Sequence, residues 1–240
     1  NGVTVGDRVV LILPQGIPLM ASFAGALLIG AVPAILAYPN FKAEPAKYRA
    51  GLSGVSKNLS AKLIVIDEGF PKALIENIVV GDDARLFEIG SSPSGQTGTS
   101  SHRVPDEPGA IAFVQHSAGT TGLQKAVALT HDAVLTQLDH LVNALSLRET
   151  DRIYSWLPLY HDMGLVGFLS IPMTTGVQLV QAAPQDFMAK PGHWMQWISD
   201  HGGTATAGPN FSWVLAGRAL RIRKETLDLS SLRIALNGAE

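Results

Sequence analysis

The sequence contains no cysteine among its 240 residues. Disulfide bonds, thiolate zinc sites and a cysteine nucleophile are therefore excluded together. Charged residues are few, at 16%, and 18 basic side chains are balanced by 20 acidic ones. This near-neutral charge argues against a protein that binds nucleic-acid phosphates, which requires a basic surface. The absence of cysteine fits a reducing, cytoplasmic setting.

The stretch from Val9 to Phe41 lacks any formal charge and is long enough in principle to cross a bilayer. Proline and glycine interrupt it repeatedly, and its longest credible helix, from Pro18 to Ile29, would span only about 18 Å. We therefore expect a buried strand, a buried helix and a second buried strand instead of a transmembrane segment. A signal peptide is not expected either, because Asp7 and Arg8 directly precede the apolar stretch.

Short apolar runs alternate with helical patterns along the whole chain, which predicts an α/β fold. Because the runs are continuously apolar, the sheets are expected to be largely parallel and covered by helices on both faces. Apolar residues at helical spacing predict helices around 48–55, 134–145 and 194–198, the last with Pro191 in its first turn. The expected strands are Val9–Leu13, Val32–Leu36, Leu63–Ile66, Ala110–Val114, Ala126–Leu129, Ile153–Trp156, Val177–Val180, Thr204–Ala207 and Leu232–Leu236.

Residues 90–109 (GSSPSGQTGTSSHRVPDEPG) are rich in glycine, serine, threonine and proline. Such a composition is typical of a flexible connector. We therefore expect two α/β halves, 1–89 and 110–240, on either side of it.

The segment from His116 to Lys125 directly follows an apolar run. Within it stand hydroxyls, glycines and a lysine: Ser117, Thr120, Thr121, Gly119, Gly122 and Lys125. Glycines let the backbone approach a phosphate closely, hydroxyls donate hydrogen bonds, and lysine adds a mobile positive charge. The spacing matches neither a Walker A loop nor G-x-G-x-x-G. Taken alone, the composition fits either a polyphosphate cradle or an ordinary hairpin turn.

In their order, these residues resemble the phosphate-binding loop of the adenylate-forming superfamily, [ST]-[ST]-G-[ST]-T-G-x-P-K-G. That superfamily includes acyl-CoA synthetases, fatty acyl-AMP ligases and peptide-synthetase adenylation domains. Further segments resemble its other motifs in the same order: Gly6–Val9, Gly30–Pro33, Ser155–Leu165 (SWLPLYHDMGL), Gly208–Phe211 (GPNF) and Leu232–Glu240 (LRIALNGAE). The Tyr-His-Asp-Met-Gly form is typical of fatty acyl-AMP ligases. The chain therefore resembles most closely part of the N-terminal domain of such a ligase.

This resemblance implies ATP-dependent conversion of a fatty acid to an acyl-adenylate, with release of pyrophosphate. The acyl group would then pass to the phosphopantetheine thiol of an acyl carrier protein. By the same resemblance, the loop residues named above and Mg²⁺ would hold the phosphates. Lys125 and His161 would be catalytic residues. His161 would also lie where the ATP and acyl pockets meet. The expected adenine contacts are Asn237, Gly238, Ala239 and Glu240, and the expected acyl contacts are Gly208, Pro209, Asn210 and Phe211.

Three residues depart from the loop pattern, namely Ala118, Gln124 and Ala126. Losing a hydroxyl that bonds a charged phosphate costs about 1.5–3 kcal/mol. These departures keep open a non-catalytic module that binds nucleotide or acyl groups. A fatty acyl-CoA synthetase, with coenzyme A as acceptor, is the nearer alternative.

Some side chains have a structural alternative to their functional interpretation. His161 could simply begin a helix, with Asp162 as its terminal carboxylate. Phe211 and Trp213 could line an acyl tunnel or pack in the core, whereas Trp194 is expected in the core.

The resemblance also implies that a Tyr-Gly-x-x-Glu metal-binding motif, a ribose-binding aspartate and a mobile C-terminal domain lie beyond Glu240. We therefore expect residues 1–240 alone to form little acyl-adenylate, and we assign no metal ligand.

Overall fold

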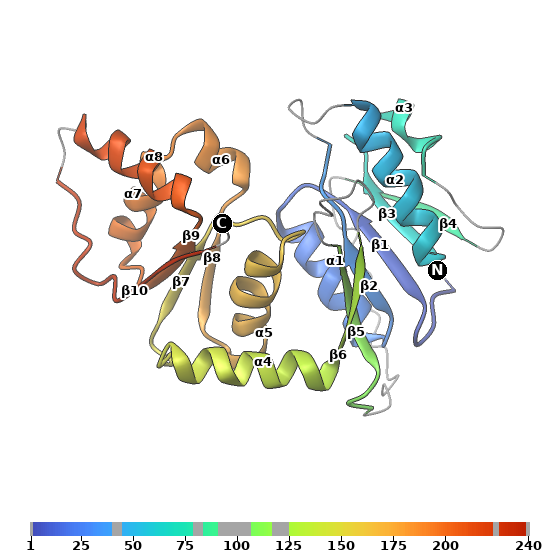
Figure 1. Cartoon of the computed structure of the whole chain (residues 1–240), viewed down its shortest axis with the longest axis horizontal. Coiled ribbons are helices and arrows are strands. Elements are labelled where there is room, and N and C mark those ends of the chain that lie inside the picture. Colours follow the sequence, from blue (N-terminus) through green and yellow to red (C-terminus); the bar gives the residue numbers. More distant parts are fainter. Residues whose placement is uncertain are drawn as a thin grey trace. The chain divides into compact units, whose positions relative to one another are not determined.

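The computed structural model describes residues 2–39, 45–78, 84–90, 107–116, 125–222 and 226–238. The chain divides into two compact units, Asn1–Val134 and Leu135–Glu240 (Figure 1). Each unit contains its own sheet, and each is described by itself.

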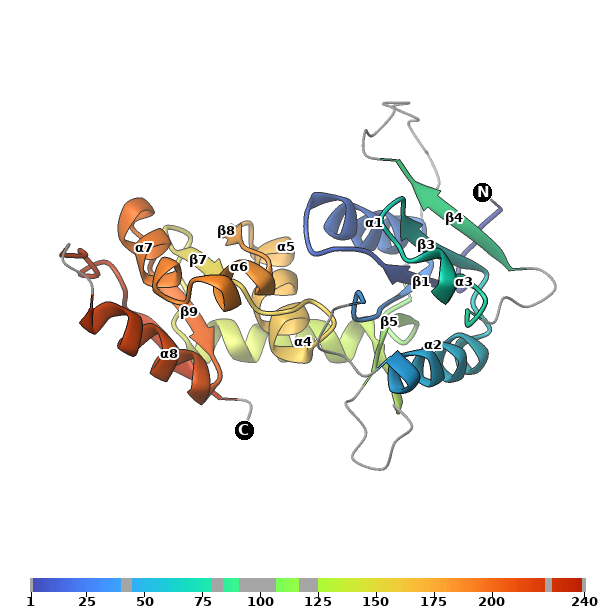
Figure 2. The same cartoon turned by 90° about the horizontal axis from the view of Figure 1, so that it is seen from above.

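The first unit is built on a six-stranded sheet with the order β4-β3-β1-β2-β5-β6. Strands β4, β3, β1 and β5 of this sheet are labelled in Figure 2. Its strands are β1 (Arg8–Ile12), β2 (Val32–Ile35), β3 (Leu63–Asp67), β4 (Arg85–Ile89), β5 (Ile111–His116) and β6 (Ala126–Thr130). All neighbours are parallel except β5 and β6, which are antiparallel with His116 opposite Ala126. The expected α/β class with largely parallel sheets is confirmed.

The uncharged stretch near the start of the chain forms β1, a helix and β2. The helices of this unit are α1 (Ile17–Leu28), α2 (Pro45–Leu59) and α3 (Lys72–Ile75), and α4 (His131–Ala144) begins at its end. Proline stands in the first turn of α1, where its missing N–H costs nothing, and Gly30 follows the helix with φ of 71°. In the described part of the chain, no helix is long and apolar enough to span a membrane.

Apolar side chains of α2 form the core with the central strands. Leu52, Val55 and Leu59 are buried together with Val10 and Ile64, which have no exposed surface. Burying apolar surface stabilises the fold by roughly 25 cal/mol per Å². The helix that the apolar spacing predicts around residues 48–55 is therefore confirmed.

Strand β4 was not expected from the sequence. It pairs in parallel with β3 along its whole length but lies at the edge of the sheet, with Arg85 to Glu88 exposed. An edge strand whose side chains are largely exposed does not need a continuous apolar run, and RLFEI, with charged Arg85 and Glu88, lacks that signal.

The second unit contains a four-stranded parallel sheet with the order β10-β9-β7-β8. Its strands are β7 (Arg152–Ser155), β8 (Gln178–Gln181), β9 (Ala205–Gly208) and β10 (Ile234–Asn237). Its helices are the π-helix η1 (Met163–Ser170), α5 (Ile171–Thr175), α6 (Pro184–Ala189), α7 (Gly192–His201) and α8 (Asn210–Arg221). In Figure 1, α7 and α8 lie on one side of this sheet and α5 lies on the other.

Aromatic side chains fill the core on the α7–α8 side. Trp156 stacks on Phe187 with ring centroids 3.9 Å apart, and Trp194 meets both rings edge-on. Trp194 is buried, and its indole N–H donates to Thr206 Oγ1 at 2.9 Å. The expectation that Trp194 is a core residue is therefore confirmed. Offset and edge-on ring contacts of this kind are favourable.

An ion pair between the buried Asp151 and the partly exposed Arg233 joins the starts of β7 and β10. Asp151 is 3% exposed and accepts hydrogen bonds from Arg233 Nε at 2.9 Å and from Thr204 Oγ1 at 2.6 Å. The backbone N–H of Arg148 donates to its second carboxylate oxygen at 2.7 Å. The carboxylate therefore fixes strands that are far apart in the sequence.

The division of the chain differs from the one expected. The expected connector was 90–109, but β5 and β6 join the first sheet and the first unit continues to Val134. Phe113 of β5 is buried and packs edge-on against Phe23 of α1, with centroids 5.7 Å apart. This apolar contact, which no local pattern reveals, holds β5 in the first unit.

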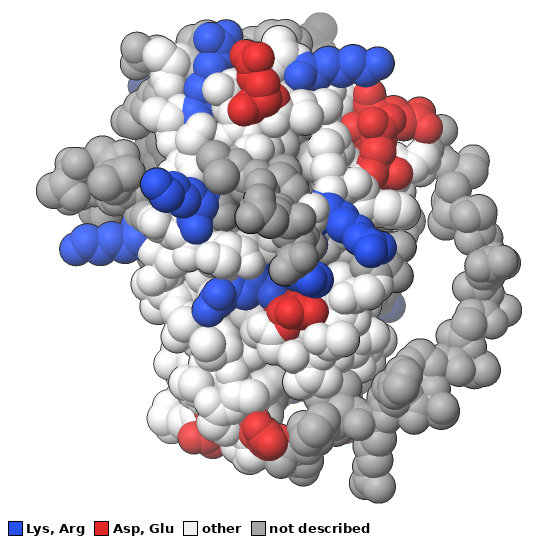
Figure 3. All heavy atoms as spheres, turned by 90° about the vertical axis from the view of Figure 1, so that its right-hand side faces the viewer, with Lys and Arg blue, Asp and Glu red and all other residues white. Residues whose placement is uncertain are grey.

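Basic and acidic side chains are interspersed on the face of the molecule drawn in Figure 3, with uncharged surface between them. No basic stripe is visible among the described residues of that face. This agrees with the net charge of −2.

Candidate functional site

The carboxyl ends of β9 and β10 lie side by side. Asn237 pairs with Gly208 in the parallel ladder, and the N–H of Gly238 donates to the Gly208 carbonyl at 3.4 Å. The side-chain amide of Asn237 also donates to Asn210 Oδ1. The structure thus brings together the motif segments that begin at Gly208 and at Leu232, which are separate in the sequence. In open parallel sheets, this edge is where ligands bind.

His161 and Asp162 follow β7 and introduce η1. Asp162 caps η1 by accepting from the N–H of Met163 at 2.7 Å, and His161 Nδ1 lies 2.6 Å from the same carboxylate oxygen. The two side chains are 49% and 72% exposed. The structural role foreseen for Asp162 is therefore confirmed, while His161 remains accessible to a ligand.

Gly164 of the same motif has no room for a side chain. A Cβ built there would overlap the carbonyl oxygen of Pro158, and its carbonyl carbon would be only 2.9 Å away. The first turn of η1 therefore lies directly on the backbone that follows β7. Glycine is required for this close approach.

We expect Gly164→Ala to lower the free energy of unfolding by about 1–3 kcal/mol, because the added methyl group must displace backbone. Urea denaturation measures this. The matched control is Gly217→Ala in α8, where a Cβ meets nothing within 4 Å and alanine is expected to stabilise the helix by about 0.5–1 kcal/mol. Equal stability of the two variants would contradict this role of Gly164.

The eight residues of η1 form a π-helix, which is wider than an α-helix. Ser170 Oγ donates to the Leu165 carbonyl at 2.9 Å, five residues earlier. Such helices are rare and are often found at functional sites. Gly167 lies in this helix, and a Cβ built there meets nothing within 4 Å.

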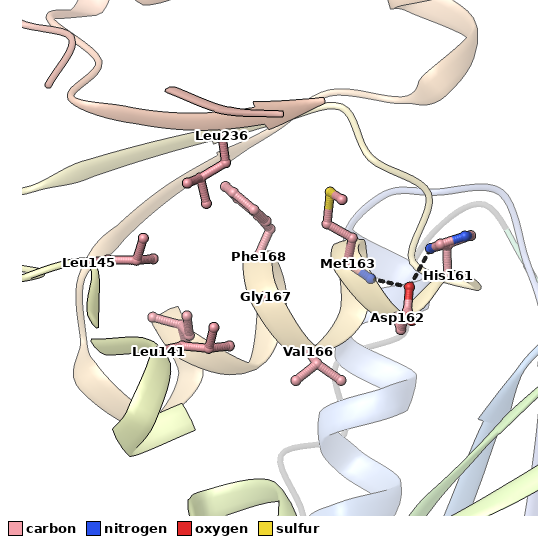
Figure 4. Close-up of a pocket in the computed structure, with 10 residues that line it drawn as sticks. Leu141, Leu145, His161, Asp162, Met163, Val166, Gly167, Phe168 and Leu236 are labelled. Carbon is pink, nitrogen blue, oxygen red and sulfur yellow. Dashed lines mark hydrogen bonds and ion pairs between the residues drawn. The ribbon is translucent and has the colours of Figure 1, made fainter. Parts of the chain in front are cut away.

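A cavity of about 510 Å³ lies beside η1 (Figure 4). This volume is typical of small-molecule sites. Most of the lining is apolar, and His161 and Asp162 are its polar members. The lining residues are Leu141, Leu145, His161, Asp162, Met163, Val166, Gly167, Phe168, Ile171 and Leu236.

Met163 connects this cavity to the end of β10. A Cβ built on Gly238 would lie 3.4 Å from Cε of Met163, so the end of the Met163 side chain lies close to Gly238. The cavity therefore adjoins the exposed polar edge formed by Asn210 and Asn237.

Sequence reasoning missed most of the cavity residues. The available signal was the uncharged run from Met163 to Thr175 directly after the His-Asp pair. The expected acyl contacts, Gly208–Phe211, are not among the ten lining residues, and Phe211 instead meets Trp156 and Phe187 edge-on. Their acyl role stays a prediction.

The central loop residues, Ser117, Gly119, Thr120, Thr121 and Gly122, lie outside the described residues, as do Ala239 and Glu240. Lys125 is described and is exposed at the start of β6 in the first unit. The loop lies between the antiparallel strands β5 and β6, which is compatible both with a polyphosphate cradle and with an ordinary hairpin turn.

Burial affects two titratable groups of the motif segments. It lowers the pKa of His116, whose two ring nitrogens are buried without a partner among the described residues, so the imidazole is neutral at pH 7. Burial also raises the pKa of Tyr160, which stays protonated.

Within the described ranges, no group of three or more His, Asp or Glu side chains could hold a metal ion. These residues therefore do not fit a protein cage for Mg²⁺. Magnesium at such a site is commonly carried by substrate phosphates with few protein ligands.

A protein-family model described as "AMP-binding enzyme" matches residues 1–240. Long-chain-fatty-acid–AMP ligase FadD32 of Mycolicibacterium smegmatis is 30% identical, with 98% of this chain and 38% of that protein covered. FadD21 of Mycobacterium tuberculosis, provisionally named a fatty-acid–CoA ligase, is also 30% identical over 99% of this chain and 42% of its own. The chain spans about two fifths of the length of these curated relatives.

Solved structures of fatty acyl-adenylate ligases also match this chain. A structure from a study of fatty acyl-adenylate ligases from E. coli and L. pneumophila matches with a TM-score of 0.85 and 30% identity, covering 99% of this chain and 43% of that one. The L. pneumophila ligase in complex with acyl adenylate and pyrophosphate matches with a TM-score of 0.79 and 27% identity, covering 100% and 41%.

Proposed function

Because this chain belongs to the AMP-binding enzyme family, we propose that it contributes to ATP-dependent activation of a fatty acid as an acyl-adenylate. The apolar cavity next to His161 is the observation that carries this proposal. An aliphatic chain gains free energy by leaving water for such a cavity, about 0.8 kcal/mol per buried CH₂. Its carboxylate would remain at the polar mouth.

In the proposed reaction, a carboxylate oxygen attacks the α-phosphorus of ATP. A bond from carboxylate oxygen to phosphorus forms, the bond between the α-phosphorus and its bridging oxygen breaks, and pyrophosphate leaves. Protein groups contribute mainly by positioning and charge stabilisation. Lys125 and the loop from Ser117 to Gly122 would hold the phosphates, with Mg²⁺ on the phosphates themselves.

His161 would sit where the carboxylate enters. Its Nδ1 is engaged by Asp162, which fixes the ring and leaves Nε2 to face a ligand. Asn237 and Gly238, with Ala239 and Glu240, would face the nucleotide base.

Gly167→Leu tests whether the cavity holds the acyl chain. A side chain at this position projects into open space, so the fold should tolerate it while the cavity shortens. We expect kcat/KM for the longest acids to fall at least about tenfold, with short acids little affected. Adenylation of acids of graded length by the full-length protein measures this, with Gly217→Leu on α8 as control.

An unchanged chain-length profile for Gly167→Leu would contradict acyl binding in this cavity. A uniform loss for all acids, with lowered stability, would indicate damage to η1 instead and would equally fail to support the assignment.

The acceptor of the acyl group is proposed to be a carrier-protein phosphopantetheine thiol. Coenzyme A is the second candidate, favoured by the name of the relative FadD21. Adding coenzyme A to preformed acyl-adenylate distinguishes them, because conversion to acyl-CoA would make coenzyme A the acceptor. A cytoplasmic location, where ATP is supplied, is part of the same proposal.

A further inference from the structure

The contact between Asn237 and Asn210 joins the last residue of β10 to the first residue of α8. The Asn237 side-chain amide donates to the side-chain oxygen of Asn210. Both side chains are exposed, so no packing demand accounts for this pairing. Asn210 is not among the cavity-lining residues.

The backbone that carries Asn210 is firmly held. The carbonyl of Gly208 accepts from Trp213 Nε1 at 3.0 Å, and Ser212 Oγ donates to the Pro209 carbonyl at 2.6 Å. A Cβ on Gly208 would lie 2.9 Å from the Trp194 ring. The backbone from which the Asn210 side chain projects is thus fixed.

The carboxyl end of β10, which includes Asn237, forms polar surface next to the cavity mouth. Met163 lines the cavity and lies close to Gly238, the residue after Asn237. If the cavity receives the acyl chain, the polar nucleotide that becomes joined to its carboxylate requires polar surface beside the mouth. The ends of β9 and β10 supply that surface.

We propose that Asn210 is a positioning residue for the nucleotide: its side-chain oxygen orients the Asn237 amide and, through it, the end of β10 that receives the base. This inference rests on the proposed function. It assigns Asn210 to the nucleotide side of the site, whereas the sequence resemblance placed it against the acyl chain.

The test compares Asn210→Ala and Asn210→Asp in the full-length protein. We expect Asn210→Ala to raise KM for ATP about three- to tenfold, the effect of one typical hydrogen bond, with KM for the fatty acid unchanged. Asn210→Asp keeps an oxygen acceptor and places a favourable charge at the helix start, so it should restore KM for ATP to within about twofold. Melting temperatures verify that the variants are folded.

A double-mutant cycle with Asn237→Ala completes the test. We expect the double variant to show no larger KM for ATP than Asn237→Ala alone, because Asn210 acts through Asn237. A rise in KM for the fatty acid instead, additive effects, or failure of Asn210→Asp to restore binding would each overturn the inference. Absence of acyl-adenylate with the unsubstituted protein would instead overturn the proposed function itself.

Discussion

Replacing Lys125 with alanine in the full-length protein is expected to lower kcat/KM for acyl-adenylate formation by about a hundred- to a thousandfold. The side chain is exposed at the start of β6, next to the loop of hydroxyls and glycines. An exposed lysine gives no stability that its loss would remove, so the effect should fall on catalysis. Its positive charge would offset charge that develops on the departing pyrophosphate.

The control for this experiment is Lys190→Ala, which removes an exposed lysine at the end of α6, in the other unit. We expect it to leave adenylation unchanged. A steady-state assay of pyrophosphate release reports both variants. If Lys125→Ala retained the activity of the Lys190→Ala control, the loop would not hold the phosphates, and the non-catalytic module would become the better interpretation.

Replacing Asp151 with asparagine is expected to lower the free energy of unfolding by about 2–4 kcal/mol, since Arg233 and Thr204 lose a charged acceptor. Asparagine matches the shape of aspartate but turns one acceptor oxygen into a donor that faces other donors. Urea denaturation measures the change, and Asp139→Asn on the exposed face of α4 is the matched control. A loss no larger than that of the control would show that the ion pair contributes little.

The same carboxylate gives stability a defined pH dependence. Burial opposes ionisation of Asp151, but its hydrogen bonds and the charge of Arg233 outweigh burial and lower its pKa from 3.8 to about 2. The contribution is therefore complete above the unfolded pKa and is lost as the pH falls from about 4 towards 2. Asp151→Asn should lack this part of the acid dependence.

Much of the fold was predictable because its signals are local. Buried parallel strands such as β1 and β3 need continuous apolar runs, and α2 needs apolar residues at helical spacing. Edge strand β4 escaped prediction because most of its residues are exposed and its apolar residues are flanked by the charged Arg85 and Glu88. The assignment of β5 to the first unit depends on a packing contact of Phe113 that is distant in sequence.

Residues of the site that belong to short sequence motifs were predictable, whereas residues that only tertiary packing brings to the site were not. The motif led to His161 and Asp162, and the parallel register of β9 and β10 placed Asn210 beside Asn237. The cavity lining comes from α4, η1, α5 and β10, whose apolar side chains look like ordinary core residues in the sequence. Steric demands, such as that on Gly164, become visible only with coordinates.

Mass spectrometry of the products formed by the full-length protein tests the central claim most directly. The protein would be incubated with MgATP and a panel of fatty acids, with and without coenzyme A. We expect an acyl-adenylate whose mass follows the acid supplied and which persists when coenzyme A is added. If no acid in the panel gave an adenylate, the proposed activation of fatty acids would be contradicted.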